Sequence, residues 1–206
     1  GGRGILLGMI PGVPPAEVVI LGAGVVGTYA ARAFRGLGAH VTVLDNNLCA
    51  LQKIAENLCG VVTMVSTPYN IKRATGYADV VVGAVLAPGQ RTPVLVTREM
   101  VHDMKPRSVI LDVSIDQGGC FETSRPTTHE NPVYIEEEVT HYCVPNLSSM
   151  VARTATHSFV NAAVPYLLEL INLGIDKAIE TVPALGMAAS THNGEVLRLS
   201  RHTNEA

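Results

Sequence analysis

The stretch that decides the fold is Val18-Val19-Ile20-Leu21-Gly22-Ala23-Gly24-Val25-Val26-Gly27. Its first four residues form a short, continuous apolar run, which predicts a buried β-strand. Three glycines follow with the spacing Gly-x-Gly-x-x-Gly, and the residues from Val25 to Arg35 predict a helix. The stretch therefore predicts a strand, a tight turn and a helix in direct succession.

Each glycine of this turn has its own expected role. Gly22 permits the sharp bend, Gly24 lets the backbone approach a pyrophosphate, and Gly27 allows the helix to pack closely on the sheet. A diphosphate would lie at the helix N-terminus, where the backbone N–H groups around Val25 and Val26 point toward it. The turn thus predicts a dinucleotide site. The alternative is a glycine-rich turn that exists for steric reasons only.

An acidic residue in the second apolar run favours the nucleotide interpretation. Asp45 ends the run that starts at Val41 and lies 18 positions after Gly27. A carboxylate at this place can accept hydrogen bonds from both hydroxyls of the adenosine ribose. Asn46 and Asn47 follow, so a 2′-phosphate would meet the negative charge of Asp45 and no nearby cation. The sequence predicts NAD rather than NADP as the cofactor.

Apolar runs alternate with helix-like segments over the first 146 residues. The expected strands are 18–21, 41–44, 61–65, 80–85, 109–113 and 142–144, and the expected helices are 25–35, 48–58, 71–77 and 97–104. Runs of continuous rather than alternating hydrophobicity are typical of parallel strands that helices cover on both faces. The sequence therefore predicts an α/β protein with a Rossmann-type, doubly wound parallel sheet flanked by helices.

The pattern changes after residue 146. Residues 151–173 predict one long helix, ended by Gly174 and kinked at Pro165. The more polar remainder is expected to pack on a neighbour or to fray. We therefore expect an NAD-binding domain over residues 1–150. The helical extension over residues 151–206 is expected to belong to a further substrate domain or to an interface.

Composition narrows the possible ligands. The net charge is −3, with 15 basic and 18 acidic residues and no run of like charge, so neither nucleic acid nor an anionic membrane is an expected partner. The longest apolar stretch, 80–87, is too short to span a bilayer. The four cysteines lack a CxxC pair, which predicts reduced, buried thiols in a cytoplasmic protein. No pair of histidines has metal-ligand spacing, so no metal site is expected.

Several further segments resemble the alanine dehydrogenase family and its relative, the NAD-binding subunit of proton-translocating transhydrogenase. The similarity begins with Gly-Gly-Arg-Gly at 1–4 and includes Gly-Ala-Val-Leu-Ala-Pro-Gly at 83–89. It is sharpest at 112–122, Asp-Val-Ser-Ile-Asp-Gln-Gly-Gly-Cys-Phe-Glu, and continues in 124–129 and 141–146. The string Asp-Gln-Gly-Gly-Cys-Phe-Glu favours alanine dehydrogenase over the transhydrogenase subunit.

The resemblance implies L-alanine catabolism, in which NAD oxidises L-alanine and water then releases pyruvate and ammonia. Asp116 matches the family's active-site aspartate. The resemblance also implies a set of cofactor-binding residues, which are Asp45 and Ser66 on the adenosine side, Val85 and Leu86 along the adenine–ribose path, Ile115 and Asp116 at the nicotinamide, and Arg125, Val144, Pro145, Asn146 and Leu147.

The position of Asp116 fits this role independently of the resemblance. It follows a predicted parallel strand, and open α/β sheets bind their ligands at the carboxyl ends of the strands. A carboxylate there can orient an amine or a water molecule. The alternative is a loop cap that accepts hydrogen bonds from backbone N–H groups.

The chain also departs from the family pattern. Ala50 stands where the family often has a basic residue, and the loop 147–152 lacks the family's usual second proline. Family members carry substrate-binding arginine, lysine and histidine in a preceding domain. We therefore expect the isolated chain to bind NAD but to turn over little or no alanine, and the full enzyme to be a homo-oligomer, a hexamer in the family. A stand-alone NAD-binding module and a transhydrogenase subunit are the alternatives.

Overall fold

The computed structural model describes residues 2–197. The chain divides into two compact units, Gly1–Pro145 and Asn146–Ala206. The residues 198–206 of the expected C-terminal extension lie outside the described part of the chain.

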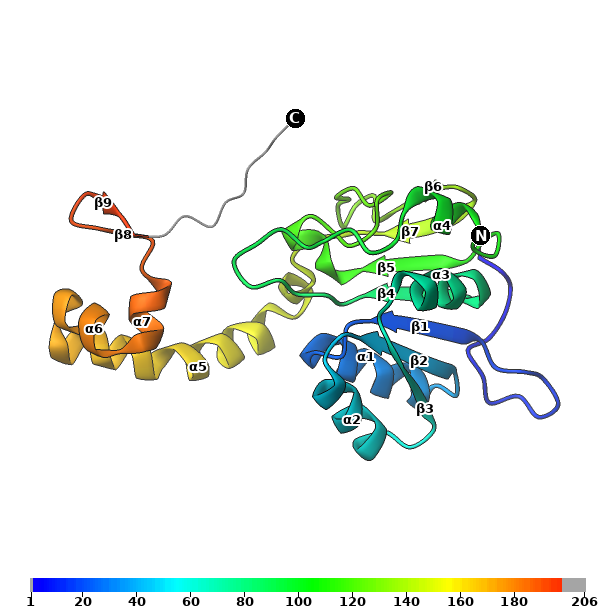
Figure 1. Ribbon diagram of the computed structural model, residues 1–206, viewed down its shortest axis with the longest axis horizontal. Coiled ribbons are helices and arrows are strands. Elements are labelled where there is room, and N and C mark those ends of the chain that lie inside the picture. The colour runs from blue at the N-terminus through cyan, green and yellow to red at the C-terminus, as the bar shows by residue number, and fades with distance from the viewer. Residues whose placement is uncertain (1, 198–206) are drawn as a thin grey trace. The chain divides into compact units, whose positions relative to one another are not determined.

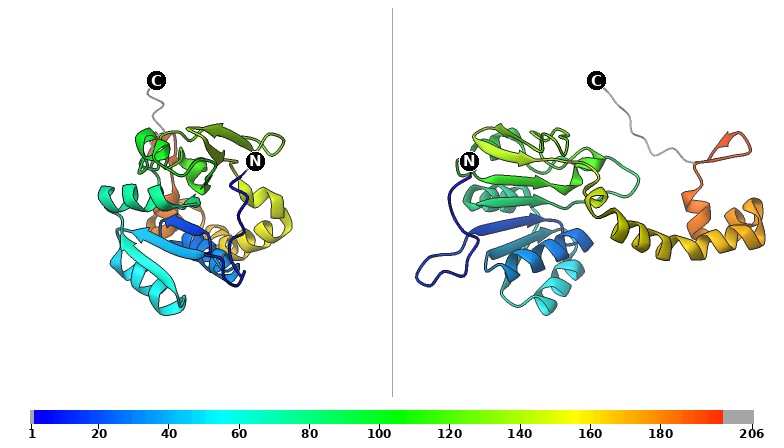
Figure 2. Two further views of the ribbon diagram at one scale, coloured as in Figure 1. Left: turned by 90° about the vertical axis from the view of Figure 1, so that its right-hand side faces the viewer. Right: turned by 180° about the vertical axis from the view of Figure 1, so that it is seen from behind.

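A seven-stranded sheet forms the centre of the first unit (Figure 1), and its order is β3-β2-β1-β4-β5-β7-β6. All neighbouring strands run parallel except β6 and β7, which form an antiparallel hairpin at the edge. The strands are β1 Glu17–Leu21, β2 His40–Asp45, β3 Val61–Val65, β4 Val80–Gly83, β5 Val109–Asp112, β6 Val133–Glu136 and β7 Val139–Tyr142. The N-terminal segment loops out at the end of the sheet where β1 begins (Figure 2).

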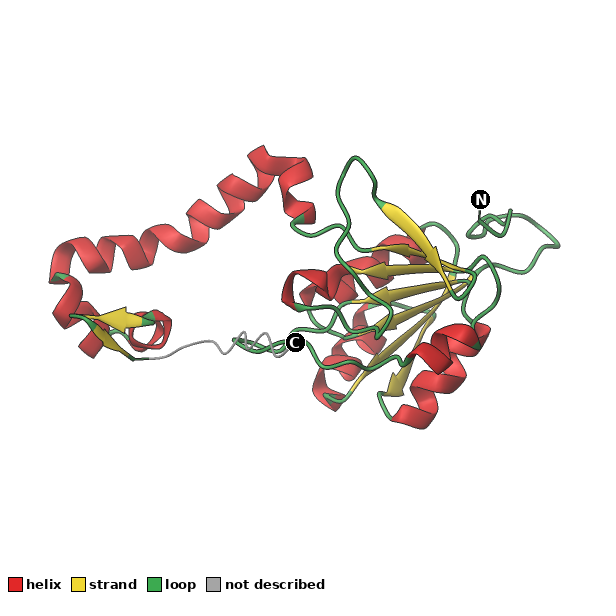
Figure 3. Cartoon of the chain, turned by 90° about the horizontal axis from the view of Figure 1, so that it is seen from above, coloured by secondary structure: helices red, strands yellow, loops and turns green. Residues whose placement is uncertain are grey.

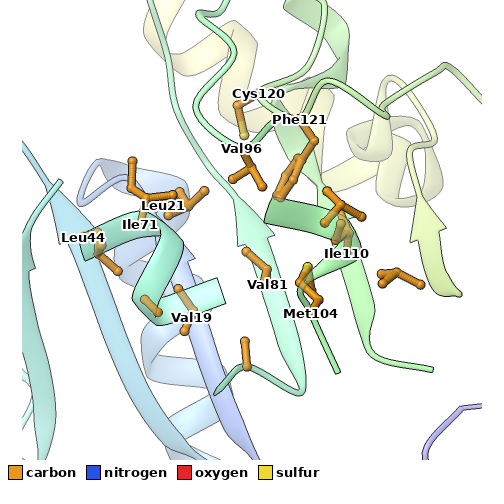
Figure 4. Packing of buried hydrophobic residues seen from close by; sticks show 14 residues of the cluster. Val19, Leu21, Leu44, Ile71, Val81, Val96, Met104, Ile110, Cys120 and Phe121 are labelled. Atoms are coloured by element: carbon orange, nitrogen blue, oxygen red, sulfur yellow. The ribbon is translucent and has the colours of Figure 1, made fainter. Parts of the chain in front are cut away.

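Helices cover both faces of this sheet (Figure 3). They are α1 Val25–Gly36, α2 Leu48–Asn57, α3 Pro68–Tyr77 and α4 Arg98–His102. Successive residues of β1 point to opposite faces, so Val18 and Ile20 pack with α1 and α2, while Val19 and Leu21 pack with α3 and α4. Figure 4 shows the second of these two cores, in which Phe121 lies close to Val96. The predicted α/β class and the flanked, mainly parallel sheet are confirmed.

Two strand predictions are wrong. The expected strand 80–85 ends at Gly83, because Val85 leaves the sheet and its N–H donates to Ser114 Oγ at 2.9 Å. The expected strand 142–144 is instead β7, which ends at Tyr142, since Cys143 O accepts a hydrogen bond from the N–H of Thr127 in a loop. Strand β6 was not predicted.

The turn between β6 and β7 explains why sequence reasoning missed the hairpin. Glu137 and Glu138 both have positive φ, 51° and 60°. Turns of this kind usually contain Asn or Gly, which adopt positive φ more readily than glutamate. Arg98 of α4 donates to Glu137 at 2.9 Å, so an ion pair holds the turn where a typical turn residue is lacking.

The second unit is mainly helical. After a short 3-10 helix η2, Leu147–Val151, it contains α5 Ala152–Leu173, α6 Ile175–Thr181 and α7 Pro183–Ala188, followed by the small hairpin of β8 Thr191–His192 and β9 Glu195–Val196. The long helix is found within one residue of its predicted bounds, with Pro165 inside it and Gly174 at its end. Many large apolar side chains of α5 are exposed, among them Phe159, Leu167 and Ile171.

The cysteines are free thiols in two environments. Cys120 and Cys143 are buried, as predicted. The prediction is wrong for Cys49 and Cys59, which are exposed. Cys49 lies in the first turn of α2 and Cys59 follows the end of that helix, so neither lies on the helix face that packs on the sheet, where Leu51 and Ile54 are buried.

Candidate dinucleotide-binding site

The glycine turn has the geometry that its sequence predicts. Gly22 adopts φ of 108°, and its N–H donates to Leu44 O at 2.7 Å. A Cβ atom on Gly27 would collide with the carbonyl oxygen of Gly22, and a Cβ atom on Gly22 would collide with the carbonyl oxygen of Ala84. These two glycines are therefore required by the close approach of β1, α1 and the segment after β4.

Gly24 differs from the other two glycines. It is exposed, and a Cβ atom there would meet no other atom within 4 Å. The first helical hydrogen bond of α1 runs from Thr28 N–H to Gly24 O at 2.9 Å, so the amides of Val25–Gly27 precede the helical ladder. Gly24 leaves space at a positively polarised helix end, which is what an approaching diphosphate needs.

Asp45 is joined directly to this turn. Its Oδ2 accepts the N–H of Ala23 at 2.6 Å, and its Oδ1 accepts the N–H of Asn47 at 2.7 Å. The two bonds fix the orientation of the carboxylate while its remaining lone pairs stay available to further donors. The acid is thus held in one orientation beside the glycine turn.

The strand order places a crevice at this edge of the sheet. The chain runs from β1 to β2 in one direction and from β4 to β5 in the other, so the carboxyl ends of β1 and β4 form the switch point at which open α/β sheets bind ligands. A pocket of about 380 Å³ lies here; it is lined by Gly22, Gly24, Leu44, Asp45, Asn46, Ala84, Val85, Leu86, Pro93 and Leu95.

A second pocket of about 200 Å³ contains Asp116 and shares three residues with the first. It is lined by Val26, Ala84, Val85, Leu86, Val113, Ser114, Asp116 and Gln117. The segment 84–86 therefore borders both pockets, with Asp45 in one and Asp116 in the other. A further pocket, formed by Arg3, Ile5, Pro14 and their neighbours, includes Asp79 at the opposite end of β4, so it is not part of this crevice.

Asp116 is exposed on the short 3-10 helix η1, Val113–Gln117, which directly follows β5. Gly118 ends this helix in the left-handed conformation, with φ of 96°. A Cβ atom on Gly118 would lie 2.8 Å from Nε of Arg91, so glycine is needed here for the space as well as for the conformation. Ile115 belongs to the same helix, but its side chain is buried.

The other predicted cofactor residues occupy different places. Ser66 follows β3, and its N–H donates to Asp45 O at 3.1 Å. The Arg125 guanidinium lies over the ring of Tyr134, with 3.9 Å from Cζ to the ring centroid. Val144 is buried and Pro145 ends the first unit, whereas Asn146 and Leu147 belong to the second unit. The roles of all these residues in cofactor binding stay predictions.

Sequence reasoning missed Asp112, the last residue of β5. Its carboxylate is buried and accepts the N–H groups of Ser114 and Cys120, both at 3.0 Å, and the hydroxyl of Ser124 at 2.6 Å. Burial raises the pKa of Asp112, and these hydrogen bonds oppose that rise. Burial also raises the pKa of the neighbouring Cys120 thiol well above its usual value, so Cys120 carries its proton. The position of Asp112 at the end of an apolar run was the only signal that the sequence offered.

A buried histidine supports the segment that leads to Arg125. His141 Nδ1 lies 3.0 Å from Val139 O, and His141 Nε2 lies 2.8 Å from Thr123 Oγ1. A carbonyl only accepts, so Nδ1 carries the proton and Nε2 accepts from Thr123. Burial lowers the pKa of His141, which favours this neutral form. The Tyr134 ring stacks on His141 with centroids 4.9 Å apart.

These features define a class: the first unit is a Rossmann-type domain whose glycine turn, strand-end carboxylate of Asp45 and switch-point crevice suit a dinucleotide. The family described as "Alanine dehydrogenase/PNT, C-terminal domain" matches residues 1–198. The chain belongs to this family, whose domain binds dinucleotides.

Similar proteins agree with that assignment. The alanine dehydrogenase of Mycobacterium tuberculosis is 46% identical over 198 residues, and that of Methanococcus maripaludis is 50% identical over 200 residues. These matches cover 96% and 95% of this chain but 53% of each relative, so the chain spans about half the length of the curated relatives.

Solved structures give the same result. A structure of L-alanine dehydrogenase, 44% identical, has a TM-score of 0.86 over 96% of this chain and 55% of that chain. The structure of transhydrogenase from Sinorhizobium meliloti, 28% identical, has a TM-score of 0.74 over 95% of this chain and 54% of that chain. Among residues 2–197, no helix is long and apolar enough to cross a membrane, and no three His, Cys, Asp or Glu residues are grouped to hold a metal ion.

Proposed function

We propose that this chain forms the NAD-binding half of an alanine dehydrogenase. The single observation that supports the proposal is the hydrogen bond between Asp45 and the glycine turn, because it holds a carboxylate beside an exposed helix N-terminus at one pocket. The 46% identity to an alanine dehydrogenase over nearly the whole chain supports the choice among dinucleotide enzymes.

The same geometry favours NAD over NADP. Both oxygens of Asp45 already accept backbone N–H groups, so the carboxylate is held at the pocket and cannot rotate away without losing those bonds. A 2′-phosphate would lie against this negative charge, and the pocket lining contains no lysine or arginine to offset it. The pocket lining therefore supports a cofactor with a free ribose 2′-hydroxyl.

NAD, when bound, would accept a hydride from the α-carbon of L-alanine. The residues of this chain bind and orient. Gly24 and the first amides of α1 would hold the diphosphate, and Asp45 would hold the adenosine ribose. The segment Ala84–Leu86 would form the wall between the two halves of the cofactor. Asp116, exposed in the second pocket, would orient the amine or the water that attacks after oxidation.

Transfer of the hydride also requires the substrate to be held at about 3–3.5 Å from the cofactor. We propose that groups for the substrate carboxylate come from another part of the complete enzyme, because the relatives are about twice as long as this chain. The complete enzyme would act in the cytoplasm as a homo-oligomer, as its resemblance to the family implies.

The second candidate is the NAD-binding part of a transhydrogenase, which the Sinorhizobium meliloti structure supports at lower identity and a lower TM-score. The two proposals differ in their response to L-alanine. A transhydrogenase part would bind NAD without any alanine-dependent reduction of it.

Calorimetric titration of the 206-residue chain with NAD and with NADP tests the binding proposal. We expect measurable binding of NAD and at least about tenfold weaker binding of NADP, because the ion at the 2′ position faces Asp45. An assay of NADH formation with L-alanine, on the product of the complete gene, tests the chemistry. Absence of NAD binding, or equal binding of the two cofactors, would overturn the proposal.

A further inference from the structure

Asp112 and the segments bonded to it form a buried hub of hydrogen bonds, which includes Ser114 of the Asp116 pocket. The donors to the Asp112 carboxylate come from residues at different distances along the chain. Ser114 is the second residue of η1, Cys120 follows the Gly118-Gly119 turn and donates through both its N–H and its thiol, and Ser124 precedes Arg125. One carboxylate thus holds the start, the end and the exit of the loop that carries Asp116.

Through Ser114, the hub also reaches the neighbouring strand. Ser114 N–H donates to Asp112 Oδ1, and Ser114 Oγ accepts the N–H of Val85 at 2.9 Å. Val85 lines both the Asp45 pocket and the Asp116 pocket. The orientation of the Asp112 carboxylate is therefore linked, by two hydrogen bonds, to the wall that the pockets share.

The backbone around the carboxylate is built to admit it. A Cβ atom on Gly119 would lie 2.6 Å from Asp112 Oδ2, and a Cβ atom on Gly83 would lie 2.9 Å from Asp112 Oδ1. Two glycines from separate segments thus leave the space that the carboxylate fills.

The ion pairs among residues 2–197 do not involve Asp112. Its exposed fraction is 2%, so neutral donors alone compensate its burial. Burial of a carboxylate without a cation is unfavourable in free energy unless hydrogen bonds to it compensate the lost hydration.

We infer that Asp112 is a positioning residue, which sets the Asp116 loop and the Val85 wall for the nicotinamide half of the cofactor. The inference rests on the proposed function and adds a residue to it. Asp112 does not touch the cofactor pockets itself, because it belongs to the lining of neither pocket. It acts through Ser114, Cys120 and Ser124.

The variant Asp112→Asn tests this role, because it keeps the shape but replaces one acceptor oxygen by an NH₂ donor. The new NH₂ group would lie against the N–H of Ser114 or of Cys120. The hydrogen bond to that N–H would be lost, and two donors would repel each other. We expect the dissociation constant for NAD to rise about tenfold, as for the loss of one buried hydrogen bond to a charged group. The dissociation constant for AMP, which lacks the nicotinamide half, should change less than about threefold.

Asp79→Asn is a control for the loss of a buried acid away from the pockets, although Asp79, unlike Asp112, is paired with Arg3 and Lys105. Asp79 is also buried, accepts the N–H of Glu17 at 2.8 Å, and precedes β4 at the opposite end of the strand from the pockets. Its variant should lower the melting temperature and leave the affinities for NAD and AMP unchanged. Equal losses of NAD and AMP affinity in Asp112→Asn would show a merely structural role and overturn the inference, and so would unchanged NAD affinity.

If Asp112→Asn does not fold, two milder variants test whether Asp112 positions the pocket residues. Ser114→Ala removes the bond to Val85, and Ser124→Ala removes one bond to the carboxylate. Each should weaken NAD binding more than AMP binding, and equal effects on the two ligands would again overturn the inference. If the unchanged chain binds no NAD, the proposed function fails first, so the two failures are distinguishable.

Discussion

The carboxylate of Asp45 accepts the backbone N–H of Ala23 at 2.6 Å, so the end of β2 is bonded to the turn between β1 and α1. Asp45 therefore lies beside the glycine turn and is also hydrogen-bonded to its backbone. A substitution of Asp45 would therefore affect both the orientation of the turn and the proposed contact with the ribose.

Asp45→Asn should weaken NAD binding about tenfold or more, because the amide loses charge and places a donor against the N–H of Ala23 or Asn47. The measurement is a calorimetric titration with NAD. Asp103→Asn, which removes one negative charge from an exposed acid outside the lining of both pockets, is the control. NAD affinity equal to that of the unchanged chain would contradict the assignment of the ribose site.

Gly24→Ala and Gly27→Ala should separate ligand binding from stability. The Cβ added at position 24 would enter open space, so this variant should keep its free energy of unfolding within about 1 kcal/mol yet lose NAD affinity. The Cβ added at position 27 would collide with Gly22 O, so the second variant should lose several kcal/mol of stability, about 3 or more.

Urea unfolding and titration with NAD, carried out on both glycine variants, check this separation. Gly36→Ala is a control for added methyl groups, since a Cβ there also meets no atom within 4 Å and Gly36 ends α1 away from the turn. The interpretation of Gly24 fails if Gly24→Ala binds NAD as tightly as Gly36→Ala does.

The free energy of unfolding should decrease as the pH falls below neutral, because of His141. Burial lowers the pKa of this histidine from its ordinary value of 6.5, so the unfolded chain binds a proton more readily than the folded chain does. The stabilisation is complete above about pH 6.5 and decreases as the pH falls toward the lowered pKa of the folded state. The free energy of unfolding at about pH 7.5 and at about pH 5.5 should therefore differ less in His141→Gln than in the unchanged chain. Equal differences would show that another group is responsible.

Glu138→Gly should stabilise the hairpin of β6 and β7. Glu138 is exposed and has φ of 60°, a conformation that costs about 1 kcal/mol for a residue with a Cβ and almost nothing for glycine. We expect the free energy of unfolding to rise by roughly 0.5–1 kcal/mol in a urea titration. Glu56→Gly in the helix α2 is the matched control and should lower stability by about the same amount.

Local patterns in the sequence were sufficient for most of the fold. Strands β1 to β5 are runs rich in valine and other apolar residues, and a helix joins each of them to the next. The hairpin of β6 and β7 could not be predicted, because an ion pair with Arg98, remote in sequence, holds its Glu-Glu turn.

The residues of the candidate site likewise include some that the sequence predicted and one that it did not. Gly22, Gly24, Gly27 and Asp45 were predicted from spacing and chemistry, since the first strand, turn and helix are continuous in the chain. Asp112 was missed because its environment consists of Gly83, Gly119 and Ser124, which only the folded chain brings together. Asp116 was predicted from the family resemblance and from its place after a strand, and its role stays a prediction.

The wall formed by Ala84, Val85 and Leu86 has a thermodynamic consequence for partial ligands. Because both pockets share this one piece of backbone, we expect a molecule bound on the Asp45 side to restrict the motion of the surface on the Asp116 side as well. The second occupant then loses less conformational entropy on arrival. AMP and nicotinamide mononucleotide, offered as two separate halves, should therefore strengthen each other's binding although no covalent bond connects them.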